Sequence, residues 1–310
     1  MAGEPHILVV GSVNMDLVVR CPRLPEPGET LAGSDFRLVP GGKGGNQAVA
    51  AARLGVSTAL IGRVGRDAFG DALLDGLSNA RVDITHVGRD DEAASGVALI
   101  LVDPNGQNSI VVAPGANGRL APEHLQAAGS MFAWADAVLV QLEVPLPTVE
   151  QALALGRQGG ALTVLDAGPA LALPEAVLKM AEIVSPNESE ARAITGIEVS
   201  DAASARLAAD RLREMGARIA VLKLGSQGAY LASDEMERHF PAFPVEPVDT
   251  TAAGDAFTAA LAVAIASGEP LPEAVRYANA AGAAATLRYG AQPSMPTPAE
   301  IAQVIQGGGV

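Results

Sequence analysis

Short apolar runs alternate with helix-like segments along most of this chain. The apolar runs have the length of strands and predict strands at 7–11, 58–62, 137–142, 161–165, 182–185 and 218–224. Between them, apolar residues recur at helical spacing and predict helices over 46–54, 68–79, 147–157, 189–194, 202–215, 255–267 and 272–287. Strands that alternate with helices form βαβ units. The pattern therefore predicts an α/β fold whose mostly parallel sheet is covered by helices on both faces.

Two stretches interrupt this alternation. Residues 13–39 show no helical pattern and are rich in Pro and Gly, and residues 96–113 indicate a β-hairpin around Asp103-Pro-Asn-Gly106. We expect both stretches to form a separate small β-sheet, a lid over the substrate face, whose exposed side needs a partner. A homodimer through the lid is therefore expected. The predicted division is an α/β core at 1–12, 40–95 and 114–310 and a lid at 13–39 and 96–113.

The composition narrows the class of protein. The 310 residues carry a net charge of −14, which disfavours nucleic acid and anionic membranes as partners. Cys21 is the single cysteine, and the four histidines show no ligand spacing, so neither a disulfide nor a zinc site is expected. The N-terminus lacks the pattern of a signal peptide, and the longest apolar run, 256–266, is too short to span a bilayer. We expect a cytoplasmic protein.

The segment Asp249-Thr-Thr-Ala-Ala-Gly-Asp255 stands directly before that apolar run. It closes a turn of small residues where a helix should begin, so the amides of Ala253, Gly254 and Asp255 would be unpaired donors at the positive end of the helix dipole. A phosphoryl group held by these amides would have Asp255 beside the incoming hydroxyl. This arrangement is typical of a kinase site with its general base and anion-binding amides on one turn. A simple N-terminal capping Asp is the alternative.

Two further segments lie near the N-terminus. In Gly11-Ser-Val-Asn14-Met-Asp16, which follows the first strand, alternate positions put the Asn and Asp side chains on one side, where they suit neighbouring hydroxyls. A turn with local hydrogen bonds is the alternative. In Gly41-Gly-Lys43-Gly-Gly-Asn46-Gln47, four glycines around a lysine allow close approach to a ligand. The segment is not a Walker A loop, because Gly44 follows Lys43, and the first strand lacks a Rossmann fingerprint.

Three segments follow later in the chain. Asn187-Glu-Ser-Glu190 reads as a helix capping box or as oxygen ligands near Mg²⁺. Lys223-Leu-Gly225-Ser226-Gln-Gly228 joins two strands and would let a nucleotide approach closely, although an ordinary hairpin would look similar. Gly290-Ala-Gln-Pro-Ser294 could contribute oxygens, together with Asp249 and Thr251, to a site for a monovalent cation.

These segments, in this order, resemble the ribokinase-like (PfkB) carbohydrate kinase family over essentially the whole chain. The Gly-Gly-Lys-Gly and Asp-Thr-x-Ala-x-Gly-Asp motifs are specific to the family, and Asn46-Gln47 indicates its ribose-phosphorylating branch. The resemblance implies a three-layer sandwich with a small β-sheet lid. The implied reaction is ATP-dependent phosphorylation of D-ribose at O5, the first step of ribose catabolism. The other matching motifs are PGET at 27–30, GAN at 115–117, QLE at 141–143 and PNESEA at 186–191.

The resemblance also implies roles for individual residues. Asp255 would be the base, with Ala252, Ala253 and Gly254 forming the anion hole. The ribose would be held by Asn14, Asp16, Gly42, Lys43, Asn46 and Glu143. The ATP site would be lined by Asn187, Lys223, Gly225, Ser226, Gly228, Gly254 and Asn279. Asn187 and Glu190 would act on Mg²⁺ through water, and K⁺ would be held by Asp249, Thr251, Ala285, Arg288, Gly290 and Ser294.

The chain departs from the family pattern at two places. Asp166-Ala-Gly-Pro-Ala170 stands where members commonly have Asn-Pro-Ala-Pro, and Lys223 stands where a small polar residue is common. Other readings remain open, namely a kinase for deoxyribose, a nucleoside or fructose, and a sugar-binding sensor without catalysis. A nicotinamide dehydrogenase is disfavoured by the missing fingerprint.

Overall fold

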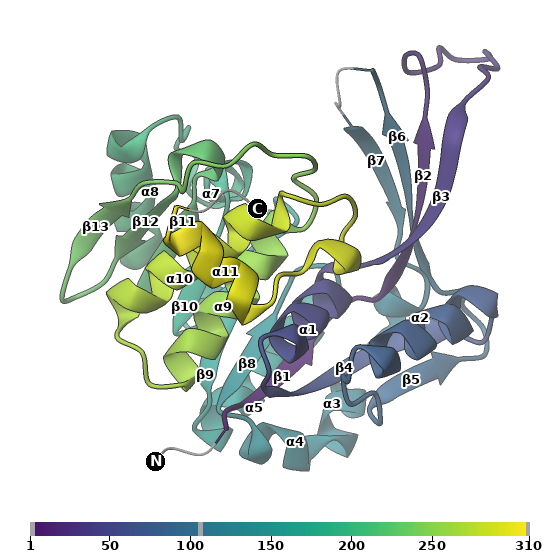
Figure 1. Ribbon diagram of the computed structural model, residues 1–310. Coiled ribbons are helices and arrows are strands. Elements are labelled where there is room, and N and C mark those ends of the chain that lie inside the picture. The colour runs from purple at the N-terminus through teal and green to yellow at the C-terminus, as the bar shows by residue number, and fades with distance from the viewer. Residues whose placement is uncertain (1–3, 105–107, 308–310) are drawn as a thin grey trace.

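Two β-sheets organise the computed structural model, which describes residues 4–104 and 108–307 (Figure 1). The larger sheet has nine strands within these residues, in the order β13-β12-β11-β10-β9-β8-β1-β4-β5. All neighbours are parallel except β11–β12 and β12–β13, which are antiparallel. The strands are β1 (His6–Val10), β4 (Ser57–Gly65), β5 (Val87–Asp90), β8 (Ala137–Val140), β9 (Leu162–Asp166), β10 (Ile183–Ser185), β11 (Ile219–Lys223), β12 (Ala229–Ala232) and β13 (Glu237–Phe240).

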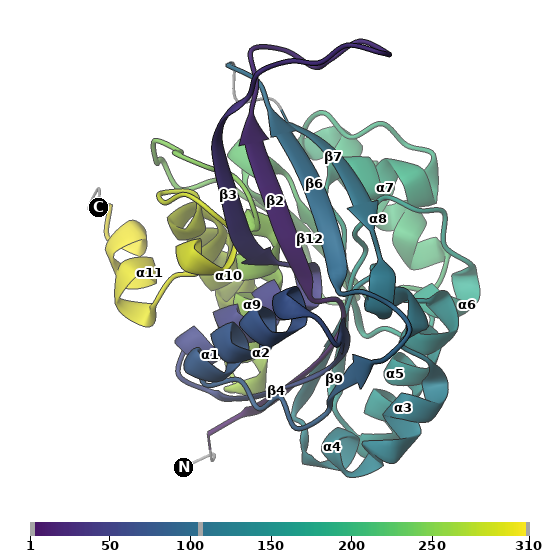
Figure 2. The same ribbon diagram turned by 90° about the vertical axis from the view of Figure 1, so that its right-hand side faces the viewer.

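Helices cover both faces of this sheet (Figures 1 and 2). Successive residues of β1 show why: Ile7 and Val9 belong to one buried apolar cluster, and Leu8 and Val10 belong to another. The first cluster includes helices α1 (Lys43–Arg53), α2 (Ala68–Asn79), α9 (Ala253–Ala266), α10 (Leu271–Ala285) and α11 (Pro298–Ile305). The second includes helices α3 (Pro122–Ala127), α4 (Gly129–Trp134), α5 (Leu146–Gly159), α6 (Glu175–Leu178), α7 (Glu188–Thr195) and α8 (Ala202–Glu214). The expected α/β fold with a mostly parallel sheet is confirmed.

The second sheet, which we call the small sheet, projects from the body beyond α1 and α2 (Figure 2). Its order is β3-β2-β6-β7, with β2 parallel to β6 and the outer pairs antiparallel. It is formed by the two stretches expected to form a lid, although residues 105–106 of the expected turn lie outside the described part. The strands are β2 (Asn14–Arg20), β3 (Ser34–Gly41), β6 (Gly96–Val102) and β7 (Asn108–Ala113). No helix in residues 4–104 or 108–307 is both long enough and apolar enough to cross a membrane.

Helix α1 begins at Lys43, before the predicted start at residue 46. The expected late start was wrong because Gly44 and Gly45 are poor helix formers, whereas tertiary packing holds them in the helix. A Cβ on Gly44 would lie 2.6 Å from the carbonyl carbon of Gly11, so only glycine lets the first turn of α1 rest on the loop after β1.

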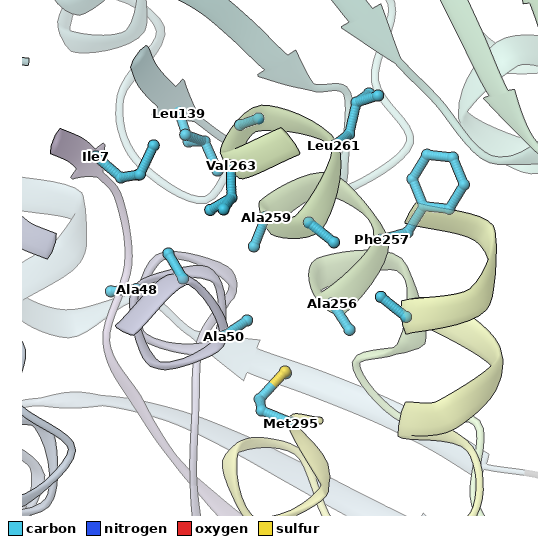
Figure 3. Packing of buried hydrophobic residues seen from close by; sticks show 14 of the residues in the cluster. Ile7, Ala48, Ala50, Leu139, Ala256, Phe257, Ala259, Leu261, Val263 and Met295 are labelled. Carbon is cyan, nitrogen blue, oxygen red and sulfur yellow. The ribbon is translucent and has the colours of Figure 1, made fainter. Parts of the chain in front are cut away.

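Small side chains let α1 and α9 pack closely in the interior (Figure 3). Ala48 and Ala50 of α1 are buried in the same cluster as Ala256 and Ala259 of α9. Alanine brings helix backbones nearer than larger apolar residues would. As a result, the N-terminal turns of α1 and α9 meet at the same end of the sheet.

Candidate active site

The turn before α9 has the geometry of an anion-binding site. Ala252, the residue before the helix, has φ 59°, a left-handed conformation that costs energy for a residue with a Cβ. The first helical hydrogen bond runs from the Ala256 amide to the Ala252 carbonyl, so the amides of Gly254 and Asp255 precede it. The amide of Ala253 was expected to be unpaired and is not, because the turn closes with a 3.3 Å bond to the Thr250 carbonyl. The amides expected to bind an anion therefore begin at Gly254.

Asp255 lies in the first turn of α9, 4% exposed, and its carboxylate is oriented by α1. The amide Nδ2 of Asn46 donates to Oδ2 at 2.8 Å, and Nε2 of Gln47 donates to Oδ1 at 3.2 Å. The ammonium of Lys43 lies 3.8 Å from Oδ1. In the described part of the chain, the buried Oδ1 of Asn46 has no hydrogen-bond partner, so it can accept a bond from a ligand hydroxyl.

The protonation states around Asp255 suit a general base. The pKa of Asp255 is raised to about 6, chiefly by burial; Lys43 and the Asn46 amide oppose this rise, while Asp166 and Glu143 add to it. Burial by itself would lower the pKa of Lys43, but the surrounding carboxylates outweigh this and raise it. Lys43 therefore stays protonated at neutral pH, and Asp255 ionises close to physiological pH.

The residues expected to hold the sugar meet beside Asp255. Asn14 and Asp16 are almost fully buried where β2 begins, and Asn14 Oδ1 accepts a 2.7 Å bond from Nδ2 of Asn117. Glu143 accepts bonds from the Ser12 hydroxyl and from the Lys43 amide. The Gly42 turn, with φ 83°, passes close to this group: a Cβ there would lie 2.7 Å from the Asn14 nitrogen.

Asp16 is the second perturbed carboxyl group. Burial, together with the nearby Glu143 and Asp255, raises its pKa to about 7. Below this pH the side chain is neutral. Only above it can the carboxylate accept two hydroxyl protons at once.

A cavity of about 670 Å³ has Asp255 in its wall, and no described residue of the small sheet lines it. It is lined by all of the residues expected to contact ATP: Asn187, Lys223, Gly225, Ser226, Gly228, Gly254 and Asn279. The other anion-turn residues, Ala252 and Ala253, also line it. A second cavity, of about 470 Å³, lies between the small sheet and the loops 247–251 and 289–293, and it reaches Asp16. Asp255 thus lines one cavity and Asp16 the other, and Pro247 and Thr250 line both.

Asn187 and Glu190 form the reciprocal capping box of α7. The carboxylate of Glu190 accepts bonds from the amide and side chain of Asn187 at 2.8 and 3.0 Å, and Glu190 is buried in the cavity wall. Mg²⁺ usually takes one or two protein oxygens and keeps several waters, so one carboxylate and one amide fit a water-mediated role. No group of three or more His, Cys, Asp or Glu side chains able to hold a metal occurs in the described residues.

Three of the residues expected to hold K⁺, Asp249, Thr251 and Gly290, line the second cavity. Asp249 accepts bonds from the amide and hydroxyl of Thr251 and from the amide of Gly290, at 2.6 to 2.9 Å. Burial would raise the pKa of Asp249, but these bonds keep it below its usual value. Arg288 donates to the carbonyl of Ser294 at 3.3 Å. Ala285 lies buried near the end of α10. Potassium binding by this cluster stays a prediction.

Four residues in the site, Gln47, Asn117, Asp166 and Thr258, were not predicted as site residues. Gln47 bridges Asp255 and Asp166, Thr258 donates to Asp166 at 3.0 Å, and Asn117 holds Asn14. Gln47 and Asn117 lay within recognised motifs, which could have signalled their roles. The two departures from the family pattern prove to be in contact, since Lys223 Nζ lies 3.1 Å from Asp166 Oδ1.

Comparison with known proteins agrees with this geometry. The model of the pfkB family of carbohydrate kinases matches residues 4–298, and the chain belongs to this family. Among curated relatives, the ribokinase of Haemophilus influenzae is 37% identical over 300 residues, covering 97% of this chain and 98% of the relative. The deoxyribokinase of Salmonella typhi is 35% identical over 292 residues, covering 94% and 95%.

A solved structure shows the same fold. Arabidopsis thaliana ribokinase, complexed with ribose and ATP, superposes with a TM-score of 0.91 at 32% identity. The match covers 98% of this chain and 99% of that one. The resemblance of the sequence to the family is therefore confirmed over nearly its whole length.

Proposed function

We propose that this protein transfers the terminal phosphoryl group of ATP to the O5 hydroxyl of D-ribose, giving ribose 5-phosphate and ADP. The observation that carries the proposal is the position of Asp255, which adjoins a group of buried polar side chains on one side and the 670 Å³ cavity on the other. A hydroxyl acceptor on the first side and a nucleotide on the second would meet at this carboxylate. The ribokinase relatives and the ribose- and ATP-bound structure support these substrates.

Asp255 would act as the general base. Ionised, it accepts the proton of the attacking hydroxyl, while Asn46 and Gln47 fix the orientation of its carboxylate. The amides of Gly254 and Asp255 would then stabilise the charge of the phosphoryl group in transfer. Lys43 would neutralise part of the same charge. A positioned base typically contributes about 10²–10⁴-fold to the rate.

Asn187 and Glu190 are the side chains that would hold Mg²⁺ through water. The ion would neutralise the polyphosphate, which is its usual part in phosphoryl transfer. The capping box fixes both side chains and so pre-orients their oxygens toward the cavity they line.

Asp16 and Glu143 favour ribose over deoxyribose as acceptor. The two carboxylates provide several acceptors for neighbouring hydroxyls, and a missing hydroxyl would leave an acceptor of the buried Asp16 unpaired. A deoxyribose kinase is the second candidate, because the Salmonella relative is nearly as similar as the ribokinases.

The small sheet would be the lid of this site and the surface of a homodimer. It carries Asp16 at its base and borders the second cavity, so its closure would exclude water. Apolar side chains on the face of the small sheet opposite the second cavity support the dimer: Phe36, Leu38, Leu99 and Val111 are 49–67% exposed. The expected cytoplasmic location stays a prediction.

The deciding experiment measures ADP release from ATP with Mg²⁺, with ribose, deoxyribose, fructose or adenosine as acceptor, in K⁺ and in tetramethylammonium. We expect the highest kcat/KM for ribose and a higher rate in K⁺. A preference for another acceptor would change the proposed substrate but not the proposed class of enzyme. Sugar binding without turnover of any acceptor would indicate a sensor, and equal rates in both salts would reject the K⁺ site.

A further inference from the structure

Asp166, at the end of β9, is a fully buried carboxylate that the proposed mechanism does not use. Its Oδ1 accepts bonds from Lys223 Nζ at 3.1 Å and from the Gly168 amide at 3.3 Å. Its Oδ2 accepts bonds from Gln47 Nε2 at 2.9 Å and from the Thr258 hydroxyl at 3.0 Å. Protein donors thus occupy both oxygens, so the carboxylate holds other side chains rather than a ligand.

Lys223 is the strongest of these partners and faces the cavity. Its side chain is 9% exposed, and besides Asp166 it reaches the Thr258 hydroxyl at 3.5 Å. An ammonium has three donors, so one N–H remains for a further acceptor. A Cβ placed on Gly254 would lie 3.7 Å from Nζ, which puts the ammonium next to the anion-binding turn.

The charge of the cavity wall supports a role toward phosphates. Among the described residues that line the cavity, Lys43 and Lys223 are the cationic ones, and Glu188, Glu190 and Asp255 are the anionic ones. A chain of net charge −14 must attract a polyphosphate through such local cations. Lys43 lies 3.9 Å from Asp166 and 3.8 Å from Asp255, whereas Lys223 lies 3.1 Å from the same oxygen of Asp166, so Asp166 holds both cations of the cavity wall.

We propose that Asp166 is a positioning residue that holds the Lys223 ammonium beside Gly254, where Lys223 pairs with the polyphosphate of ATP. The inference rests on the proposed function, because it takes the 670 Å³ cavity to be the nucleotide site. Without Asp166, a flexible lysine would lose its ionic partner in a largely buried position and would turn toward water. The carboxylate is ionised at neutral pH: burial raises its pKa, but the charges of Lys223 and Lys43, together with the hydrogen bonds from Lys223 and Thr258, bring it below its usual value.

Binding of a nucleotide in the absence of sugar tests the proposed roles of Asp166 and Lys223. The affinity of the magnesium complex of the non-hydrolysable imido analogue of ATP is compared with that of adenosine by calorimetry. Lys223→Met should weaken binding of the analogue about 10-fold or more and change that of adenosine less than 2-fold. Asp166→Asn should give the same pattern, and the double variant should be no weaker than Lys223→Met alone. A purely structural ion pair would lower both affinities together or leave both unchanged, and either result would overturn the proposal.

Matched variants control for loss of charge and of fold. Lys179 and Glu175 form an exposed ion pair of 3.0 Å at α6, so Lys179→Met and Glu175→Gln should leave both affinities unchanged. Urea midpoints show which variants are folded. If Asp166→Asn does not fold, Lys223→Gln serves, because its amide can still donate to Asp166 but carries no charge. Analogue affinity within 2-fold of the wild type in that variant would contradict the proposal.

The same experiment separates this inference from the proposed function. A wild-type protein that binds the analogue through Lys223 but phosphorylates no sugar would refute the ribose activity and leave the inference standing. If the wild type phosphorylates ribose but Lys223→Met binds the analogue normally, the ribose activity stands and the inference is refuted. Failure of the wild type to bind the analogue would refute the inference.

Discussion

The ammonium of Lys43 lies 3.8 Å from the carboxylate of Asp255, although the two residues begin different helices. The contact exists because α1 and α9 pack through alanines, which brings their first turns together (Figure 3). One helix supplies the carboxylate and the backbone amides proposed to bind the phosphoryl group, and the other supplies the cation and the two side-chain amides that orient the carboxylate.

Replacing Asp255 by Asn should remove the base and keep its shape. We expect kcat to fall by about 10²–10⁴-fold, since a positioned base contributes that much, while ribose still binds. Steady-state kinetics and calorimetric titration with ribose measure the two effects. Asp75→Asn, at an exposed position on α2, is the control and should keep full activity. Near-normal turnover in Asp255→Asn would refute its role as base.

The activity should depend on pH through two carboxyl groups. The pKa of Asp255 is raised to about 6 and that of Asp16 to about 7, so both become protonated as the pH falls. kcat/KM for ribose reports the free enzyme and should decline below about pH 7 with a limiting slope of 2 on logarithmic axes. In Asp16→Asn the slope should fall to 1. An unchanged slope would show that Asp16 does not titrate in this range.

Asp16 should also lower the stability of the ligand-free protein at high pH. Because its folded pKa is raised, the folded state binds the proton more tightly than the unfolded state, and this stabilisation is lost as pH rises through about 7. Asp16→Asn should therefore raise the free energy of unfolding by about 2–4 kcal/mol at pH 8. The gain at pH 5 should be distinctly smaller. Urea unfolding at the two pH values measures both gains in the free energy of unfolding. Equal gains would contradict the link between stability and protonation of Asp16.

The left-handed residue Ala252 should cost stability. Ala252→Gly removes the Cβ at φ 59° and should stabilise the protein by about 0.5–1 kcal/mol. The matched control is Gly160, at φ 83° with open space around it, where Gly160→Ala should destabilise by about 1–2 kcal/mol. Thermal and urea unfolding compare the two. Destabilisation by Ala252→Gly would mean that packing of the Ala252 methyl group stabilises the protein more than the left-handed backbone destabilises it.

The dimer should depend on the exposed apolar face of the small sheet. Val111, on β7, is 67% exposed, and Val111→Asp would bury a charge in an interface through this face. We expect the variant to be monomeric by light scattering after gel filtration. Leu207, 52% exposed on α8, is the control, and Leu207→Asp should leave the mass unchanged. A dimer in Val111→Asp would place the interface elsewhere.

Much of the fold follows from local patterns. The apolar runs of β1, β4, β8, β9, β10 and β11 were predicted from sequence because buried parallel strands leave continuous apolar signals. The short strands β5 and β13 were not predicted, because they are partly exposed or very brief and their pairing is set by neighbours rather than by their own residues.

For the site, the sequence determined which residues carry chemistry: Gly-rich and Asp-containing turns before helices are local features, and so are capping boxes. Tertiary structure alone decided which of these turns meet. The contact of Lys43 with Asp255 and that of Asp166 with Lys223 depend on helix packing and strand order, which bring together residues far apart in the chain. Burial in that shared space then raises the pKa values of Asp255 and Asp16, because desolvation depends on the surroundings that the fold provides and not on the residue itself.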